Sequence, residues 1–356
     1  MAQSIPAAIR NSALKAIGLA GLLSAALPAS SLAQDGTVTI GFLLKTMQEA
    51  RYQTDKSLFT ARAESQGAKV VFDSSGNDPL RQLQQVEEML EMGIDVMVLQ
   101  PVNTGTAGAL VNLAHDHGVK VVGYDSMLQG GPLDVMVMQD SWAVGRLQGE
   151  AMVDWFTANR GDVTGRVALI RGQPGDANAA ALSSGVLEVL SQNPGLELVA
   201  DRNHVDWSPD AARVTAENLL VEYDNGIDAF ICNNSGLAYG VLAALGDEGL
   251  ASAGEVFVAG SDADLRNVRL VANEVQALEI WKQIKPLAYA AADIAIKIGN
   301  SPEVDVDELI GEHSLINNGF AEIPTIITPV IAVSKDTVDA TVIEGGFYTS
   351  EQVYQD

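Results

Sequence analysis

Acidic, amide and basic side chains recur in this chain where predicted strands end. They are Arg51, Asp125, Asp176, Asn178, Asn233, Asn234, Asp262 and Lys282. Carboxylates accept hydrogen bonds from hydroxyl groups, while Arg, Lys and Asn donate bonds in return. A small polyol such as a sugar needs both kinds of partner. Aromatic rings can cover the apolar face of a sugar ring, and Tyr52 and Trp207 lie in the neighbouring predicted loops.

The motifs of catalysis and of cofactor binding are missing from the sequence. It contains no P-loop, no G-x-G-x-x-G, no G-x-S-x-G and no H-E-x-x-H. His115 and His117 stand at a predicted helix end without a third metal ligand. Asp305-x-Asp307 has isoleucine where a calcium loop needs Gly and Glu. We therefore predict no catalytic residue, no metal site and no cofactor. These absences favour a binding protein over an exported enzyme.

The elements that position these side chains occur twice. Gly93-Ile94-Asp95 opens an apolar strand, a polar loop, a helix and a further strand that ends at Gly123-Tyr124-Asp125. Gly226-Ile227-Asp228 opens a second copy, which ends at Gly260-Ser261-Asp262. Strands alternating with helices form parallel sheets, and such sheets bind ligands at the carboxyl ends of their strands. The fold class expected is α/β, with two doubly wound parallel-sheet domains that face each other across a cleft.

The repeat also predicts how the chain divides. A new first strand at residues 166–171 restarts the series, so we expect one domain from residues 34–139 plus 263–318 and another from 140–262 plus 319–356. The strand at 276–280 is assigned to the first of these. Crossings are expected near Gln139-Asp140, near residues 260–262 and between about 316 and 324. Three parallel linkers predict a hinge that closes on a ligand.

The first 33 residues read as a secretory signal peptide. Arg10 and Lys15 precede an apolar stretch, and Ser31-Leu32-Ala33 forms a small-residue cleavage site. The formal net charge of −25 disfavours nucleic acid and anionic lipid as partners. Cys232 is the one cysteine and lies in an apolar strand pattern, which predicts a buried thiol and excludes an internal disulfide.

Several segments resemble a known family. They include MLEMGIDVMVLQPVN, GVKVVGYDSM, GSDADLRNVRLVANEVQALEIWKQIKPLA and the tail ITPVIAVSKDTVDATVIEGGFYTSEQV. With them, nearly the whole mature chain resembles the type I periplasmic sugar-binding proteins of ABC importers, and most closely the D-xylose-binding branch. The resemblance implies a periplasmic monomer that captures D-xylose or a similar pentose or hexose and delivers it to a membrane permease. The alternative is a sugar-sensing partner of a chemoreceptor or sensor kinase.

The resemblance also implies sugar contacts at the strand-end residues named above, with Tyr52 where the branch usually has a stacking Trp. This chain departs from the branch at two further positions. Ser126 stands where the branch has Arg, and Asn234 stands where it has Asp. Ser126 therefore lacks the paired N–H donors of an arginine, and Asn234 lacks the negative charge of an aspartate acceptor. A roomier pocket is expected, which extends the expected ligands to hexoses and other polyols.

Overall fold

A computed structural model describes residues 36–355. The signal peptide predicted for residues 1–33 lies outside the described residues. No helix within 36–355 combines the length and the apolar character needed to cross a bilayer.

The first sheet has seven strands in the order β11-β12-β5-β4-β3-β1-β2. Its strands are β1 Thr39–Leu44, β2 Lys69–Ser74, β3 Val96–Leu99, β4 Lys120–Tyr124, β5 Val135–Gln139, β11 Ser314–Asn317 and β12 Glu322–Thr328. Only the β11–β12 pair is antiparallel. The central strand β3 is apolar and buried throughout, and β4 is buried after Lys120, as expected of a parallel sheet covered on both faces.

Helices cover both faces of this sheet. They are α1 Arg51–Ser65, α2 Pro79–Glu91, α3 Gly108–Asp116, α9 Ile284–Asn300 and α10 Val306–Ile310, with a short turn η1 at Thr104–Thr106. One apolar cluster joins α1 and α9 to the sheet, and a second joins α2 and α3 to it. Asp78 caps α2 by accepting from the backbone N–H groups of Leu80 and Arg81, and Pro79 occupies the first helical turn.

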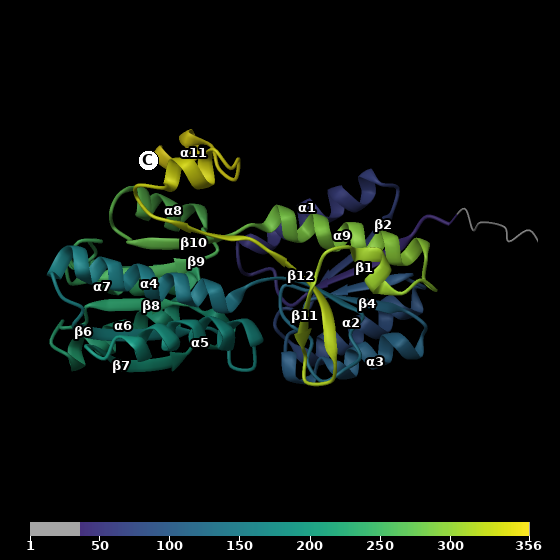
Figure 1. Cartoon of the computed structure of the whole chain (residues 1–356), viewed down its shortest axis with the longest axis horizontal. Coiled ribbons are helices and arrows are strands. Elements are labelled where there is room, and N and C mark those ends of the chain that lie inside the picture. Colours follow the sequence, from purple (N-terminus) through teal and green to yellow (C-terminus); the bar gives the residue numbers. More distant parts are fainter. Residues whose placement is uncertain (1–35, 356) are drawn as a thin grey trace, which may run out of the picture. The chain divides into compact units, whose positions relative to one another are not determined.

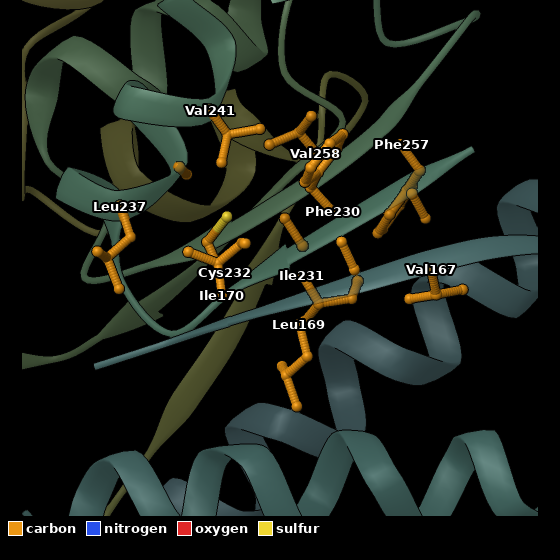
Figure 2. Packing of buried hydrophobic residues seen from close by; sticks show 14 of the residues in the cluster. Val167, Leu169, Ile170, Phe230, Ile231, Cys232, Leu237, Val241, Phe257 and Val258 are labelled. Atoms are coloured by element: carbon orange, nitrogen blue, oxygen red, sulfur yellow. The ribbon is translucent and has the colours of Figure 1, made fainter. Parts of the chain in front are cut away.

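The second sheet has six strands in the order β13-β10-β9-β8-β6-β7. Its strands are β6 Gly165–Arg171, β7 Leu196–Asn203, β8 Ala229–Cys232, β9 Phe257–Ser261, β10 Leu278–Lys282 and β13 Val330–Val333. Only β13 runs antiparallel to its neighbour. In Figure 2, Leu237 and Val241 of α7 pack above one face of this sheet, while Leu169 and Ile231 extend to the other.

The helices around the second sheet are α4 Ser141–Arg160, α5 Ala177–Gln192, α6 Pro209–Glu222, α7 Ser235–Asp247, α8 Leu265–Ala272 and α11 Ser350–Tyr354, with a short turn η2 at Val205–Trp207 and a π-helix η3 at Asp339–Ile343. Figure 1 shows α11, in yellow, beside α8. These C-terminal elements form a small apolar cluster around Trp281. Cys232, at the end of β8, is completely buried, and burial raises the pKa of its thiol.

The chain passes between the sheets three times, between β5 and α4, between β10 and α9, and between β12 and β13. The first crossing lies where the sequence predicts it. The second and third lie later, because β10 pairs with β9 and β12 pairs with β5. The expected return of the 276–280 strand to the first half is therefore wrong, and residues 322–328 belong to the first sheet. An apolar strand fits the core of either sheet, so its composition did not reveal its partner.

Candidate functional site

The guanidinium of Arg51 links the strand ends of the two sheets. Its Nη2 lies 3.1 Å from Asp125 Oδ1, and its Nη1 lies 3.4 Å from Asp262 Oδ1. Asp125 follows β4 of the first sheet and Asp262 follows β9 of the second. Arg51 Nε also lies 3.4 Å from Asp55 Oδ2, one turn along α1. The two carboxylates that end equivalent strands thus share one buried cation.

Two further ion pairs surround this guanidinium. Lys282 Nζ lies 2.7 Å from Asp262 Oδ1 at the end of β10. Lys45 Nζ, just after β1, lies 2.7 Å from Asp176 Oδ2, which precedes α5 of the other sheet. All four side chains are buried. Buried charges persist only when they are closely paired, so each sheet contributes groups of both signs to one network.

Amides and a hydroxyl complete the coordination of the carboxylates. Gln100 Nε2 donates to Asp125 Oδ2 at 2.8 Å and to the Tyr52 hydroxyl at 2.9 Å. Asn178 Nδ2 lies 3.3 Å from the same Asp125 oxygen and 2.8 Å from Ser126 Oγ. The site therefore holds both charged and neutral donors around fixed acceptors, which is the arrangement that a polyol requires.

Two aromatic rings enclose the cationic side of the site. Lys45 Nζ lies 5.0 Å from the centroid of the Trp207 ring and 5.9 Å from that of Tyr52. Trp207 is buried, and its indole N–H has no hydrogen-bond partner among residues 36–355. Tyr52 occupies the first turn of α1 next to Arg51.

The backbone around the site is strained. Asp125, Asp206, Trp207, Asp262 and Ala263 all have positive φ, between 54° and 98°. Residues other than glycine rarely adopt these backbone angles, because each such residue destabilises the fold by about 1–3 kcal/mol. Strained residues of this kind are often found at ligand-binding sites. Surrounding hydrogen bonds and packing must therefore hold these residues in place.

Two adjoining cavities lie at this point. The smaller, of about 10 Å³, is lined by Lys45, Glu49, Arg51, Tyr52, Asp125, Asn178, Trp207, Asp262 and Lys282. A larger one of about 870 Å³ shares Glu49, Trp207 and Asp262 with it and continues past Asn234 and Asp264. The smaller space is the size of one water because the charged groups touch one another, whereas the larger is within the range of small-molecule sites.

The network shifts the pKa of several carboxyl groups. Burial favours protonation of Asp125, but Arg51, Lys282 and Lys45 outweigh it and lower the pKa of that carboxyl. Within the described part of the chain Glu49 forms no ion pair, and burial, opposed by the charge of Lys45, raises its pKa to about 7. Burial, followed by the charge of Asp262, raises the pKa of Asp264 to about 6.

The structure brings ten of the eleven predicted site residues to these cavities or to their supporting network. Those that line the smaller cavity are Arg51, Tyr52, Asp125, Asn178, Trp207, Asp262 and Lys282. Asp176 and Ser126 lie behind them, 3.2 Å apart between Oδ1 and Oγ. Asn234 lines the larger cavity and caps α7. Asn233 lines neither cavity, because its Oδ1 accepts from the Gly172 backbone N–H and from Ser183 Oγ.

Three residues at this site were missed from the sequence. Lys45 and Gln100 directly follow β1 and β3, so the rule that identified Asp125 and Asp262 also applied to them. Glu49 lies in the loop before α1, and no local pattern distinguishes it from a solvated carboxylate.

Two doubly wound α/β sheets whose carboxyl edges share one buried polar site define a two-domain ligand-binding protein. Residues 40–301 match the model of the periplasmic binding protein domain. The chain is 33% identical to the D-xylose-binding periplasmic protein of Escherichia coli K12, covering 89% of this chain and 92% of that protein. It is 32% identical to the D-xylose-binding periplasmic protein of Haemophilus influenzae, covering 91% and 95%.

The chain belongs to the periplasmic binding proteins, and its predicted resemblance to the sugar-binding type I members and their D-xylose-binding branch is confirmed. Its fold is shared with the carbohydrate transporter solute-binding protein of Chloroflexus aurantiacus, solved in complex with D-glucose. That structure superimposes with a TM-score of 0.77 at 24% identity, covering 89% of this chain and 98% of the other. These relatives are solute-binding proteins, and those of the D-xylose branch are periplasmic.

Proposed function

We propose that this protein captures a monosaccharide, D-xylose or a similar pentose or hexose, between its two sheets and delivers it to an ABC permease in the periplasm. It carries out no chemistry on the sugar. The observation that supports this most is the sharing of Arg51 between Asp125 and Asp262. A ligand that bonds to all three groups is held by both halves of the protein at once.

Sugar hydroxyls suit this network because each can donate and accept. A hydroxyl can accept from Arg51 or Lys282 while it donates to Asp125 or Asp262, which replaces direct ion pairs by bonds through the ligand. Hydrogen bonds to charged groups contribute about 1.5–3 kcal/mol each before the cost of ordering the ligand. Tyr52 and Trp207 supply flat apolar surface beside the same charges.

Hinge closure follows from the connectivity. Three separate crossings join the sheets, so each half can move as a body while its own core remains packed. The sugar favours the closed form only by the extra bonds that it makes there, and these come from residues of both sheets.

Titration calorimetry tests the proposal on the chain from residue 36 onward. D-xylose, other pentoses, hexoses and acyclic polyols are titrated separately, with thermal unfolding as a second measurement. We expect binding of at least one pentose or hexose. A folded protein that shows neither heat nor thermal stabilisation with any of them would exclude the monosaccharide proposal.

Delivery to a permease needs a separate measurement. The sugar-loaded protein is expected to stimulate ATP hydrolysis by its reconstituted permease, whereas the sugar alone is not. The monomeric state and the role of sensory partner remain predictions from the sequence, and light scattering and sugar-dependent pull-down would test them.

A further inference from the structure

Glu279 is a carboxyl group buried in the second sheet, on the strand next to the edge strand β13 and behind the proposed sugar site. It lies on β10 opposite Gly260 of β9, and it is fully shielded from solvent. A Cβ atom at Gly260 would overlap Glu279 Oε1, so the glycine leaves the space that the carboxyl occupies. Through this space the carboxyl reaches Ser235, the first residue of α7.

Both carboxyl oxygens of Glu279 have close partners. Oε1 accepts from Gln276 Nε2 at 2.6 Å, and Oε2 accepts from the backbone N–H of Ala263 at 3.0 Å. Oε2 also lies 2.7 Å from Ser235 Oγ. Ser235 Oγ in turn lies 2.9 Å from the Ser261 carbonyl oxygen and accepts from the Asp264 N–H at 3.2 Å.

Counting protons assigns the state of this carboxyl. A serine hydroxyl has one proton to donate and two lone pairs with which to accept. With an ionised Glu279, Ser235 faces two acceptors, Glu279 Oε2 and the Ser261 carbonyl, with a single proton. With a neutral Glu279, the acid donates to Ser235, Ser235 donates to the Ser261 carbonyl, and every contact has one donor and one acceptor.

We propose that Glu279 is a positioning residue for ligand binding, which as a neutral carboxylic acid fixes the turn from Ser261 to Asp264 and so the carboxylate of Asp262. This inference rests on the proposed function. Asp262 and Ala263 have φ of 98° and 55°, and such a turn persists only where its surroundings determine it. The N–H groups of Ala263 and Asp264 and the carbonyl of Ser261 all end in the network of Glu279 and Ser235.

The electrostatics agree with the proton count. Burial raises the pKa of Glu279 to about 8, with Asp264 adding to the rise and Ser235 and Gln276 opposing it. The titratable groups that face it from neighbouring elements are Asp264, the Cys232 thiol of β8 and the Tyr348 hydroxyl of the C-terminal segment. Each of these is neutral or negative near neutral pH, and no cation among residues 36–355 forms an ion pair with Glu279.

The test is the pH dependence of D-xylose affinity between about pH 7 and pH 9.5. In the wild type we expect the affinity to fall above about pH 8, by up to about tenfold per pH unit, because ionisation frees Asp262 from its fixed position. In Glu279→Gln, which cannot ionise, the ratio of Kd at about pH 9.5 to Kd at about pH 8 should approach one, because Glu49, with a pKa of about 7, is already largely ionised at the lower of these pH values. Glu217→Gln, an exposed change in an ion pair with Arg213 on α6, should keep the wild-type ratio.

Parallel pH profiles for the wild type and Glu279→Gln would overturn the inference. If no sugar binds to the wild type, the proposed function fails, and infrared spectroscopy still decides the state of Glu279. We expect the carbonyl band of a neutral carboxylic acid near pH 7.5 that is lost by about pH 9.5. This measurement is made in Glu49→Gln, because Glu49, with a pKa of about 7, also loses a proton in this interval. It does not need Glu279→Gln, so it stands even if that variant does not fold. Absence of a band lost in that interval would overturn the neutral acid.

Discussion

At the scale of single residues, the site depends on one planar cation shared by two carboxylates. A guanidinium presents several N–H donors in a rigid fork, whereas a lysine ammonium is a compact point charge. Arg51 uses separate nitrogens toward Asp55, Asp125 and Asp262. One side chain can therefore hold carboxylates of both sheets in fixed directions within the site.

Removing one carboxylate should weaken sugar binding. Asp262→Ala removes an acceptor from Lys282 and Arg51. Asp125→Ala removes an acceptor from Gln100 and Arg51. We expect each change to cost about 2 kcal/mol or more, or about 30-fold in Kd, because buried donors lose their partner. Calorimetry at neutral pH measures the effect, with the exposed Asp247→Ala as the control. Wild-type affinity in both site variants would mean that the sugar binds elsewhere.

The ion pair between Lys45 and Asp176 should show strong coupling in stability. Lys45→Met leaves Asp176 buried without its cation, and breaking a buried pair in this way costs about 3–5 kcal/mol. The double variant with Asp176→Asn removes both charges and should recover most of that loss. Urea unfolding of the four proteins of this cycle gives the coupling, and Arg213→Met serves as an exposed control. Additive losses in the double variant would show that the pair is not coupled.

Asp125, Asp262 and Lys282 could be predicted from the sequence because a strand that ends in a polar residue has a known place in a parallel sheet. The same rule placed Asn233 at the site, yet its side chain turns to the Gly172 backbone and to Ser183. A position at a strand end fixes where the Cα lies. The direction of the side chain depends on tertiary hydrogen bonds that no local pattern contains.

At the scale of elements, the short turn η2 is held against the end of β6. Asp206 and Trp207 both have left-handed backbone, and the Trp207 ring lies over Gly172, where a Cβ atom would overlap it. The turn and the strand end therefore fit each other only with a glycine at residue 172. This contact places the indole ring on the wall of both cavities.

Gly172→Ala should displace the Trp207 ring and reduce sugar affinity by about fivefold, since well-packed aromatic contacts contribute about 1 kcal/mol. Near-ultraviolet circular dichroism would report the ring, and calorimetry would report the affinity. The matched control is Gly246→Ala in α7, where the added methyl meets open space and should add about 0.5–1 kcal/mol of stability. Unchanged affinity in Gly172→Ala would remove Trp207 from the binding surface.

Two crossings between the sheets lie later in the chain than predicted, because the pattern of a strand does not reveal which strand it pairs with. The run LEIWK of β10 is buried throughout, with Leu278, Ile280 and Trp281 as its apolar residues, and β12 alternates, so both were recognisable as strands. Their partners are set by pairing across long sequence separations, Leu278 with Ala259 and Thr325 with Met136. Only the complete sheet decides these pairings, because every parallel strand presents the same backbone hydrogen-bonding edge.

At the scale of the whole molecule, the three crossings allow the two sheets to approach each other, so ligand binding should make the protein more compact. D-xylose, or whichever sugar binds in the titrations, should reduce the radius of gyration measured by small-angle scattering, because ligand bonds to both sheets favour the closed form. A double variant with Asp125→Ala and Asp262→Ala should show no such reduction at the same sugar concentration. An identical radius with and without bound sugar in the wild type would contradict hinge closure.

Burial of Cys232 has a practical consequence for a reporter of ligand capture. Because the native sulfur is enclosed at the end of β8, maleimide dyes should leave the folded wild-type chain unlabelled. A cysteine introduced at Val205, which is 64% exposed on the rim of the larger cavity, would then be the single handle for an environment-sensitive fluorophore. The fluorescence of such a conjugate would report how much of the protein has bound ligand, with no signal from a second labelled cysteine.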